Sequence, residues 1–163
     1  QTRVEYKGPY DFGGLYKMIN SWMTKRKYKV HEGKYKDKIS TIYGSEVEVK
    51  MEGKRKQTEY IRFYVNIFIH AWDYKEKEGL VNGKKIHYTD GRVKVYITTS
   101  VEFDWQKRFQ DGRQSTKLMG KLYHWIKHHE FKTIYVDDQE YEALRLQHAV
   151  KKFLNMETDT HAY

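Results

Sequence analysis

The chain has 163 residues, a formal net charge of +9 and a sequence pI near 9.4. It contains no cysteine, which excludes disulfides, thiol catalysis, iron–sulfur clusters and thiolate zinc sites. Aromatic residues make up 16% of the sequence, and a disordered chain is poor in them, so we expect one folded domain over residues 1–156 and a frayed tail over residues 157–163.

The N-terminal part predicts a short edge strand followed by an amphipathic helix. Residues 2–6 alternate, Pro9 interrupts them, and Asp11 is a good N-cap. The apolar residues that follow at helical spacing are Phe12, Leu15, Tyr16, Ile19, Trp22 and Met23. We expect Trp22 to anchor this helix on the sheet. The helix should end near the run Lys25-Arg26-Lys27, whose cations complement a helix C-terminus.

The middle of the chain predicts a series of antiparallel strands. Residues 28–43 are ambiguous between strand and loop, whereas residues 46–52 alternate apolar and charged side chains as a half-buried strand does. Residues 57–72 form a longer alternation, with Ile61 to Ala71 at the inward positions. Asn82-Gly83 supplies the positive φ values of a tight hairpin turn.

A last strand and two helices are expected in the C-terminal half. Residues 92–105 follow a second turn at Asp90-Gly91, and their apolar side chains, Trp105 among them, are expected to face inward. The first helix carries an apolar stripe from Leu118 to Ile126, and the second carries one from Ala143 to Leu154.

This order of elements predicts an α+β domain. The expected architecture is an antiparallel meander sheet with an N-terminal helix and two C-terminal helices on one face. The order also fits a START-like helix-grip arrangement, in which a curved sheet wraps a C-terminal helix. That likeness concerns the fold alone and carries no function.

Four segments resemble an uncharacterised family of small basic archaeal proteins. They are the opening DFGGLY with Trp22 one helix later, the stretch KYKVHEGKYKDKIS, the strand GSEVEVKMEG and the hairpin LVNGKKIHYTDGRVKVYI. The resemblance covers the chain up to about Trp105 and departs after it. The family has no assigned activity, so the resemblance implies an archaeal origin and carries over no catalytic residue.

Basic residues concentrate in three patches. Between Lys25 and Lys38 seven cations oppose two anions, which places +5 of the total +9 in fourteen residues. The cations expected to bind RNA or another polyanion are Lys25, Arg26, Lys27, Lys29, Lys34, Lys36 and Lys38, with Lys54, Arg55 and Lys56 at a turn and Lys117 and Lys121 on a helix. Such residues can track phosphates, although lysine-rich faces are also common as solvated surface.

No cofactor and no metal is expected. His124 and His128 are four residues apart, a spacing that can hold a metal, but the sequence indicates no third ligand. Glu102 and Asp104 share a strand face, which predicts a cross-strand ion-pair lattice rather than a catalytic pair. The sequence shows no phosphate-binding glycine loop, so an enzyme is the least favoured class.

The outer face of residues 57–72 is unusually aromatic. Its ring-bearing residues, with one from a later strand, are Tyr60, Tyr64, Phe68, Trp72 and Tyr96. Few monomers leave so many aromatic side chains to water. Three explanations compete: a second helix layer covers them, a partner subunit covers them, or nucleic-acid bases stack on them. Of these, a neighbouring subunit is the contact that we expect for Tyr64, Phe68 and Trp72.

The sequence therefore favours a non-enzymatic basic protein that binds RNA, a ribonucleoprotein or another polyanion. Two alternatives stay open: a structural protein that self-assembles into homo-oligomers, and a START-like carrier of an apolar small molecule. The most apolar stretch, residues 65–72, is too short to span a bilayer, so no membrane insertion is expected. A cysteine-free chain rich in Lys and Glu fits a cytoplasmic location, and the absence of an initial Met leaves open a leader that has been removed.

Overall fold

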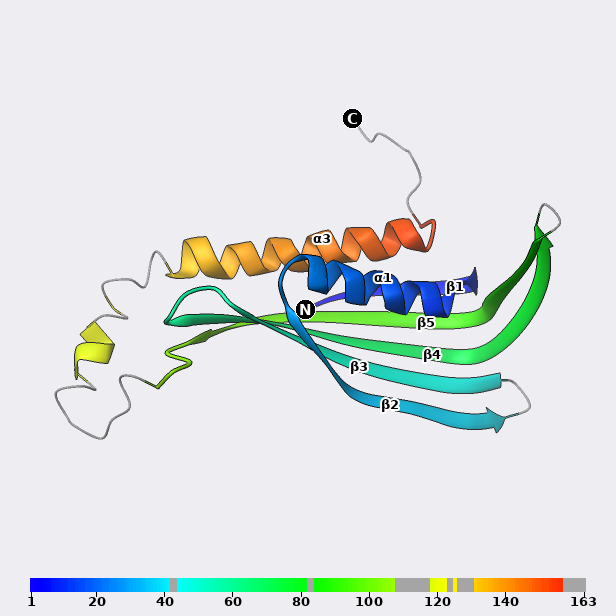
Figure 1. The fold of residues 1–163 in the computed structure, drawn as a ribbon, viewed down its shortest axis with the longest axis horizontal. Helices are drawn as coiled ribbons and strands as arrows, with labels where there is room; N and C mark the ends of the chain where they lie inside the picture. The colour runs from blue at the N-terminus through cyan, green and yellow to red at the C-terminus, as the bar shows by residue number, and fades with distance from the viewer. Residues whose placement is uncertain (42–43, 82–83, 108–117, 123–124, 126–130, 157–163) are drawn as a thin grey trace, which may run out of the picture.

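The fold consists of one sheet and two long helices (Figure 1). This computed structural model describes residues 1–41, 44–81, 84–107, 118–122, 125 and 131–156. The elements are β1 (Thr2–Tyr10), α1 (Phe12–Lys25), β2 (Lys29–Thr41), β3 (Gly44–Lys56), β4 (Ile61–Val81), β5 (Lys84–Phe103), the π-helix η1 (Phe131–Val136) and α3 (Asp137–Phe153). The expected tail at 157–163 lies outside the described residues.

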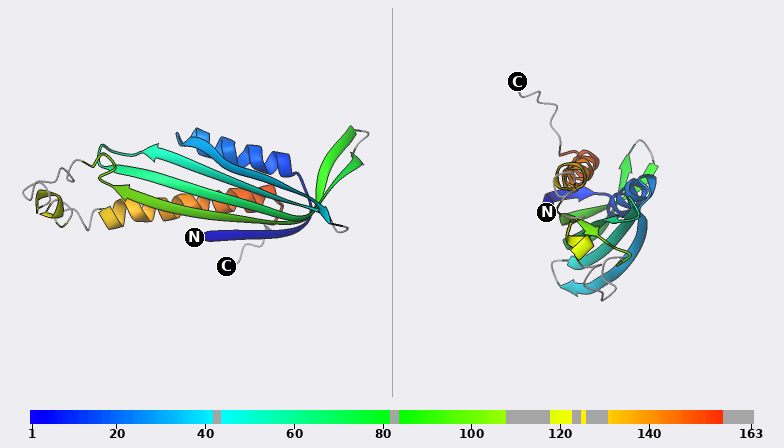
Figure 2. Two further views of the ribbon diagram at one scale, coloured as in Figure 1. Left: turned by 90° about the horizontal axis from the view of Figure 1, so that it is seen from below. Right: turned by 90° about the vertical axis from the view of Figure 1, so that its left-hand side faces the viewer.

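All five strands form one antiparallel sheet in the order β1-β5-β4-β3-β2. The segment that was ambiguous in the sequence is the edge strand β2. Helix α1 connects the two outermost strands, and it lies on the same face of the sheet as α3 (Figures 1 and 2). The predicted α+β class, with an antiparallel sheet and helices on one face, is thus confirmed.

The core lies between the sheet and the two helices. The inward side chains of β4 are at most 2% exposed, and they are Ile61, Phe63, Val65, Ile67, Ile69 and Ala71. They pack with the buried stripes of α1 and α3, which are Leu15, Ile19 and Met23, and Ala143, Leu146 and Val150. The strict alternation in β4 therefore sets which face of the sheet the helices cover.

The anchor of α1 differs from the sequence prediction. Leu15, Ile19 and Met23 are fully buried, whereas Trp22 is only partly buried. The Arg26 guanidinium lies 3.9 Å from the centroid of the Trp22 ring. Residues spaced by four form the stripe that faces the sheet, and Trp22 lies beside that stripe. Trp22 thus packs against the core from a partly buried position, and the fully buried anchors of the helix are Leu15, Ile19 and Met23.

The first of the two predicted C-terminal helices adds nothing to the core in the residues that can be described. Residues 118–122 and 125 are helical and lie beyond the end of the sheet (Figure 1). Leu118 is 69% exposed and Trp125 is 77% exposed. One C-terminal helix, α3, together with α1, covers the sheet.

The long β4–β5 hairpin bends at a defined position. The register shifts between Trp72 and Lys75, and Asp73 between them has a positive φ of 55°. Beyond the bend, the hairpin curves toward the helix side of the sheet (Figure 1), where Tyr74 meets the ring of Phe12 edge-on at 5.6 Å. Gly91 lies opposite the bend, where a Cβ atom would come within 2.7 Å of the Trp72 carbonyl oxygen. Glycine is thus required there by close packing of the backbone.

Replacement of this glycine should destabilise the fold. We expect Gly91→Ala to lower the free energy of unfolding by about 1–3 kcal/mol, because the new methyl group meets backbone rather than a flexible side chain. The matched control is Gly13→Ala in α1, whose Cβ would have its nearest neighbour at 3.6 Å. That change should be neutral or stabilise by up to about 1 kcal/mol. Urea unfolding of both variants measures the difference, and equal effects would show that the bend tolerates a side chain.

Candidate functional site

The face of the sheet that the helices leave open carries a mixture of rings and charges. The outward side chains of β4 are Arg62, Tyr64, Asn66, Phe68, His70 and Trp72. Both α1 and α3 lie on the opposite face (Figure 2). The explanation in which a second helix layer covers these rings is therefore wrong for the described residues. A partner subunit and base stacking remain.

Cross-strand register places a lysine beside two of these rings. Phe68 pairs with Lys50 of β3, whose Nζ lies 5.2 Å from the ring centroid. Tyr64 pairs with Lys54, at 5.8 Å. On the other side of Phe68, Tyr96 of β5 stacks on it at a centroid distance of 5.9 Å and an interplanar angle of 23°. The ammonium groups of the two lysines thus lie over the rings of Phe68 and Tyr64.

Tyr60 does not belong to this aromatic face. It precedes β4 in a turn where the Thr58 hydroxyl oxygen accepts hydrogen bonds from the backbone N–H groups of Tyr60 and Ile61, at 3.2 and 2.9 Å. Its ring lies 6.3 Å from that of Phe103 and packs against the core. The alternation that assigned Tyr60 outward begins only at Ile61, so the sequence prediction for this residue is wrong.

Trp105, unlike Tyr60, belongs to the open face of the sheet. The sequence prediction turned Trp105 inward, but β5 ends at Phe103 and Asp104 has a positive φ of 52°. After this turn the Trp105 ring lies 3.9 Å from the Arg62 guanidinium on the open face. Its indole N–H donates to the Thr58 carbonyl oxygen at 3.2 Å, which fixes the orientation of the ring. The inward prediction for Trp105 is wrong because the strand alternation stops two residues earlier.

The turn after α1 and the turn after β3 form one basic cleft. Lys29 pairs with Lys54 in the register of β2 and β3, so two sequence patches lie side by side. The hollow between them has a volume of about 720 Å³ and adjoins Trp105. Its cations are Arg26, Lys27, Lys29, Lys54, Arg55, Lys56 and Arg62. We call this hollow the basic cleft.

The two arginines predicted for this site have partners within the fold. The Arg26 guanidinium lies 3.0 Å from a carboxylate oxygen of Glu142, a residue of α3 whose side chain is 8% exposed. Arg55 lies between the rings of Tyr28 and Phe63, at 4.6 and 5.3 Å, and donates to the Arg26 carbonyl oxygen at 3.2 Å. These contacts join α1, β3 and α3 and shape the wall of the cleft.

The lysines of the cleft have fewer or weaker partners within the fold than the two arginines have, so they are more available to a ligand. Lys27 and Lys29 are exposed and make no ion pair or side-chain hydrogen bond within the part of the chain that the structure describes. Lys54 lies 3.3 Å from Glu52, and Lys56 pairs with Glu59. Exposed pairs of this kind contribute little to stability, so a phosphate can replace the carboxylate at small cost.

Two further basic residues named from the sequence, Lys25 and Lys121, lie outside the basic cleft. Lys25 lines a separate groove between α1 and α3, together with Trp22 and Lys152. Lys121 is exposed on the helical segment beyond the sheet, and Lys117 lies outside the described residues, as do His124 and His128.

The second half of the predicted basic segment runs along the edge strand β2. Lys34 lies opposite Lys50 in the register, whereas Lys36 and Lys38 lie opposite Glu48 and Glu46. The sequence patch between Lys25 and Lys38 is therefore divided between the cleft and the edge of the sheet. The net charge of +5 counted for residues 25–38 in the sequence is therefore larger than the charge that this segment gives to either surface.

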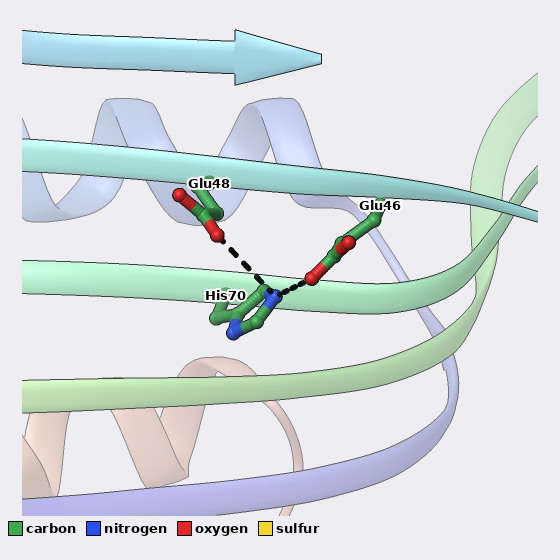
Figure 3. A group of neighbouring side chains, drawn as sticks. All are labelled: Glu46, Glu48 and His70. Atoms are coloured by element: carbon green, nitrogen blue, oxygen red, sulfur yellow. Dashed lines mark hydrogen bonds and ion pairs between the residues drawn. The ribbon is translucent and has the colours of Figure 1, made fainter. Parts of the chain in front are cut away.

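At the far end of the open face, a histidine lies between two glutamates (Figure 3). His70 Nε2 lies 2.5 Å from Glu46 Oε1 and 3.9 Å from Glu48 Oε1. Their three ligand atoms lie within 4.8 Å of one another, which makes this the one group among the described residues that could hold a metal ion. The contact with Glu46 is a histidine–carboxylate hydrogen bond, and the His70 ring lies 3.7 Å from that of Trp72. The sequence alone did not indicate this cluster, because it does not reveal the strand register in which His70 faces Glu48.

A hollow of about 510 Å³ lies between the cleft and this histidine. The residues of the open face that line it are Lys50, Glu52, Asn66, Phe68, His70, Tyr96 and Thr98. Its walls are thus a stacked pair of rings with polar groups at the rim.

Comparison of the chain with models of known protein families and with curated proteins gave no match. The archaeal resemblance therefore stays a prediction. In the described part of the chain, no helix combines the length and the apolar character that crossing a bilayer needs.

Two buried tyrosines give the fold a dependence on alkaline pH. Burial raises the pKa of Tyr28, although a hydrogen bond donated by Gln139 at 3.2 Å and the charge of Arg55 act in the opposite direction. Burial, and then the neighbouring Tyr74, raise the pKa of Tyr10. Above about pH 10 the unfolded chain releases these protons first, so stability falls as the pH rises toward the raised values.

We expect each of the two tyrosines to lower the free energy of unfolding by up to roughly 1.4 kcal/mol per pH unit above about pH 10. Tyr10→Phe should keep its stability at neutral pH, because the Tyr10 hydroxyl makes no hydrogen bond with a described residue, and should lose less at alkaline pH. Tyr141→Phe, a change at an exposed tyrosine of α3, should behave as the wild type does. Urea unfolding at neutral and alkaline pH distinguishes them, and an unchanged alkaline loss in Tyr10→Phe would contradict the assignment.

Proposed function

We propose that the protein binds the phosphates of RNA or another polyanion in the basic cleft and performs no catalysis. The observation that carries this proposal is the convergence of lysines from two separate turns on one hollow. Lys27 and Lys29 come from the turn after α1, and Lys54 and Lys56 come from the end of β3. Two of these four lysines have no carboxylate partner among the described residues.

Electrostatics gives the reason for this assignment. Clustered cations repel one another, and a polyanion relieves that repulsion while it releases its own counterions. The net charge of +9 attracts such a partner over the whole molecule. Arg62 and Trp105, which stack at 3.9 Å at the rim of the cleft, add a flat surface beside the charges.

Self-assembly is a second candidate, favoured by a different observation. The helical residues beyond the sheet expose Leu118, Met119, Leu122 and Trp125. Exposed apolar groups of this size are typical of protein contacts. The carrier hypothesis has less support, because core side chains of β4 and α3 that are buried pack directly on one another.

The electrostatic proposal predicts a change in salt dependence. The double variant Lys27→Gln/Lys29→Gln should bind a labelled single-stranded RNA more weakly, and its slope of log affinity against log salt should be shallower by roughly 1–2. Both side chains are exposed, so the fold should remain intact. The control Lys17→Gln/Lys152→Gln removes the same charge from the exposed faces of α1 and α3. Fluorescence anisotropy over a salt series measures the slopes, and equal slopes in the two double variants would refute binding at the cleft.

The assembly candidate predicts a concentration dependence. If the exposed residues join subunits, light scattering should show an oligomer whose mass falls in Leu122→Glu, because a carboxylate cannot be buried in an apolar contact without a large cost. The salt series above should leave that oligomer unchanged. A wild type that stays monomeric at every concentration would exclude this candidate.

A further inference from the structure

The hollow on the open face lies outside the basic cleft and has its own chemistry. We propose that it receives an unpaired base of a single-stranded nucleic acid, stacked on Phe68 and Tyr96. This inference rests on the proposed function, because the phosphates on either side of that base would be held by the lysines of the cleft and of β3.

The walls of the hollow suit a flat ring. Phe68 and Tyr96 are cross-strand neighbours whose rings are nearly parallel, at 23° and 5.9 Å. Both rings are partly exposed, although the inward neighbours of Phe68 are fully buried. An aromatic surface held in place by two strands costs little entropy when a base stacks on it.

Polar groups at the rim remain available for the edge of a base. The Asn66 amide, the Thr98 hydroxyl and the Tyr96 hydroxyl make no hydrogen bond with residues that the structure describes. An amide offers both donors and acceptors, which is what a base edge requires. An apolar small molecule would leave these groups without partners, so the hollow fits a base better than a lipid-like ligand.

A track of lysines connects the cleft with the hollow. Along the open face, Lys56 lies 5.8 Å from the Trp105 ring, Lys54 lies 5.8 Å from Tyr64, and Lys50 lies 5.2 Å from Phe68. The three lysines share one side of β3, and the rings lie next to them on β4 and after β5. The same pairing of a cation and a ring therefore occurs three times along the face, and Glu52, which lies 3.3 Å from Lys54, stands between Lys50 and Lys54 on β3. Phosphates on the lysines and bases on the rings would match this order.

The track ends at the two glutamates beside His70. Glu48 and Glu46 follow Lys50 on the same side of β3, and their negative charges repel phosphate. Lys50 makes no ion pair with any residue in the described ranges, whereas Lys94, farther along the face, lies 3.1 Å from Glu5. The base that reaches Phe68 is therefore the last one that the face accommodates.

Charge also argues against a second copy of this chain on the same face. A second copy that placed its basic end over the same end of this face would bring Lys54 and Lys56 of each copy against the other, in a molecule that already carries +9. A duplex nucleic acid is equally unsuitable, because its bases stack on one another and hide the surfaces that these rings would contact. The partner that remains is a single strand.

The test compares three probes by anisotropy or by competition: a labelled single-stranded RNA, its duplex of the same length, and inorganic polyphosphate, which has no bases. Phe68→Leu keeps apolar volume at a partly exposed position and should fold. It should weaken single-strand binding roughly ten-fold and leave polyphosphate binding unchanged. Tyr96→Leu should act in the same direction. Tyr141→Leu removes an exposed ring from α3 and should change neither affinity.

The outcomes separate this inference from the proposed function. If polyphosphate, duplex and single strand bind alike and Phe68→Leu has no effect, the hollow takes no base although the cleft binds phosphate. If none of the probes binds, the proposed function fails and this inference fails with it. If light scattering shows that Phe68→Leu dissociates an oligomer of the wild type, a second copy covers this face and the inference is overturned. A preference for the single strand that disappears in Phe68→Leu and persists in Tyr141→Leu supports it.

Discussion

The one-sided cover of the sheet is the constraint on which the rest of this structure depends. Strands β1 and β2 lie at opposite edges, so α1 must cross the sheet to connect them, and it does so on the face that α3 also covers. The inward side chains of β4 are buried as a result, and every second residue of the same strand is left on the face that neither α1 nor α3 covers. Everything that the protein can offer to a large partner on this sheet therefore comes from the outward alternation.

The open face is partly covered by its own side chains. Lysine ammonium groups lie over Phe68, Tyr64 and Trp105, so each of these partly exposed rings has a cation within 6 Å. Contacts of this kind contribute only about 0.5–1 kcal/mol each at exposed sites, so a ligand can replace them. An ammonium group that turns toward a phosphate uncovers a ring for a base. The same residues can thus keep the face soluble when free and form contacts when it is bound.

The periodic patterns of the sequence predicted the strands and helices correctly, but they did not predict the direction of side chains just beyond the strand ends. Alternation identified the inward and outward faces of β4, and helical spacing identified α1. Tyr60 and Trp105 were assigned to the wrong faces because each lies just beyond a strand end, where the turns at Thr58 and Asp104 decide the direction of the side chain. The basic cleft required the pairing of Lys29 with Lys54, which are distant in sequence and adjacent only through the sheet.

In the basic cleft the arginines make contacts within the fold and the lysines are available to a ligand, and the chemistry of the two side chains explains this difference. A planar guanidinium can stack on rings and still donate hydrogen bonds, as Arg55 does between Tyr28 and Phe63, and it can hold a buried carboxylate, as Arg26 does with Glu142. An ammonium group on a flexible stem is a mobile point charge that remains hydrated. The arginines therefore join α1, β3 and α3 at the wall of the cleft, and the register of β2 and β3 places Lys29 beside Lys54. A cleft whose walls are joined in this way presents its charges without first having to be assembled, which lowers the entropic cost of binding a polyanion.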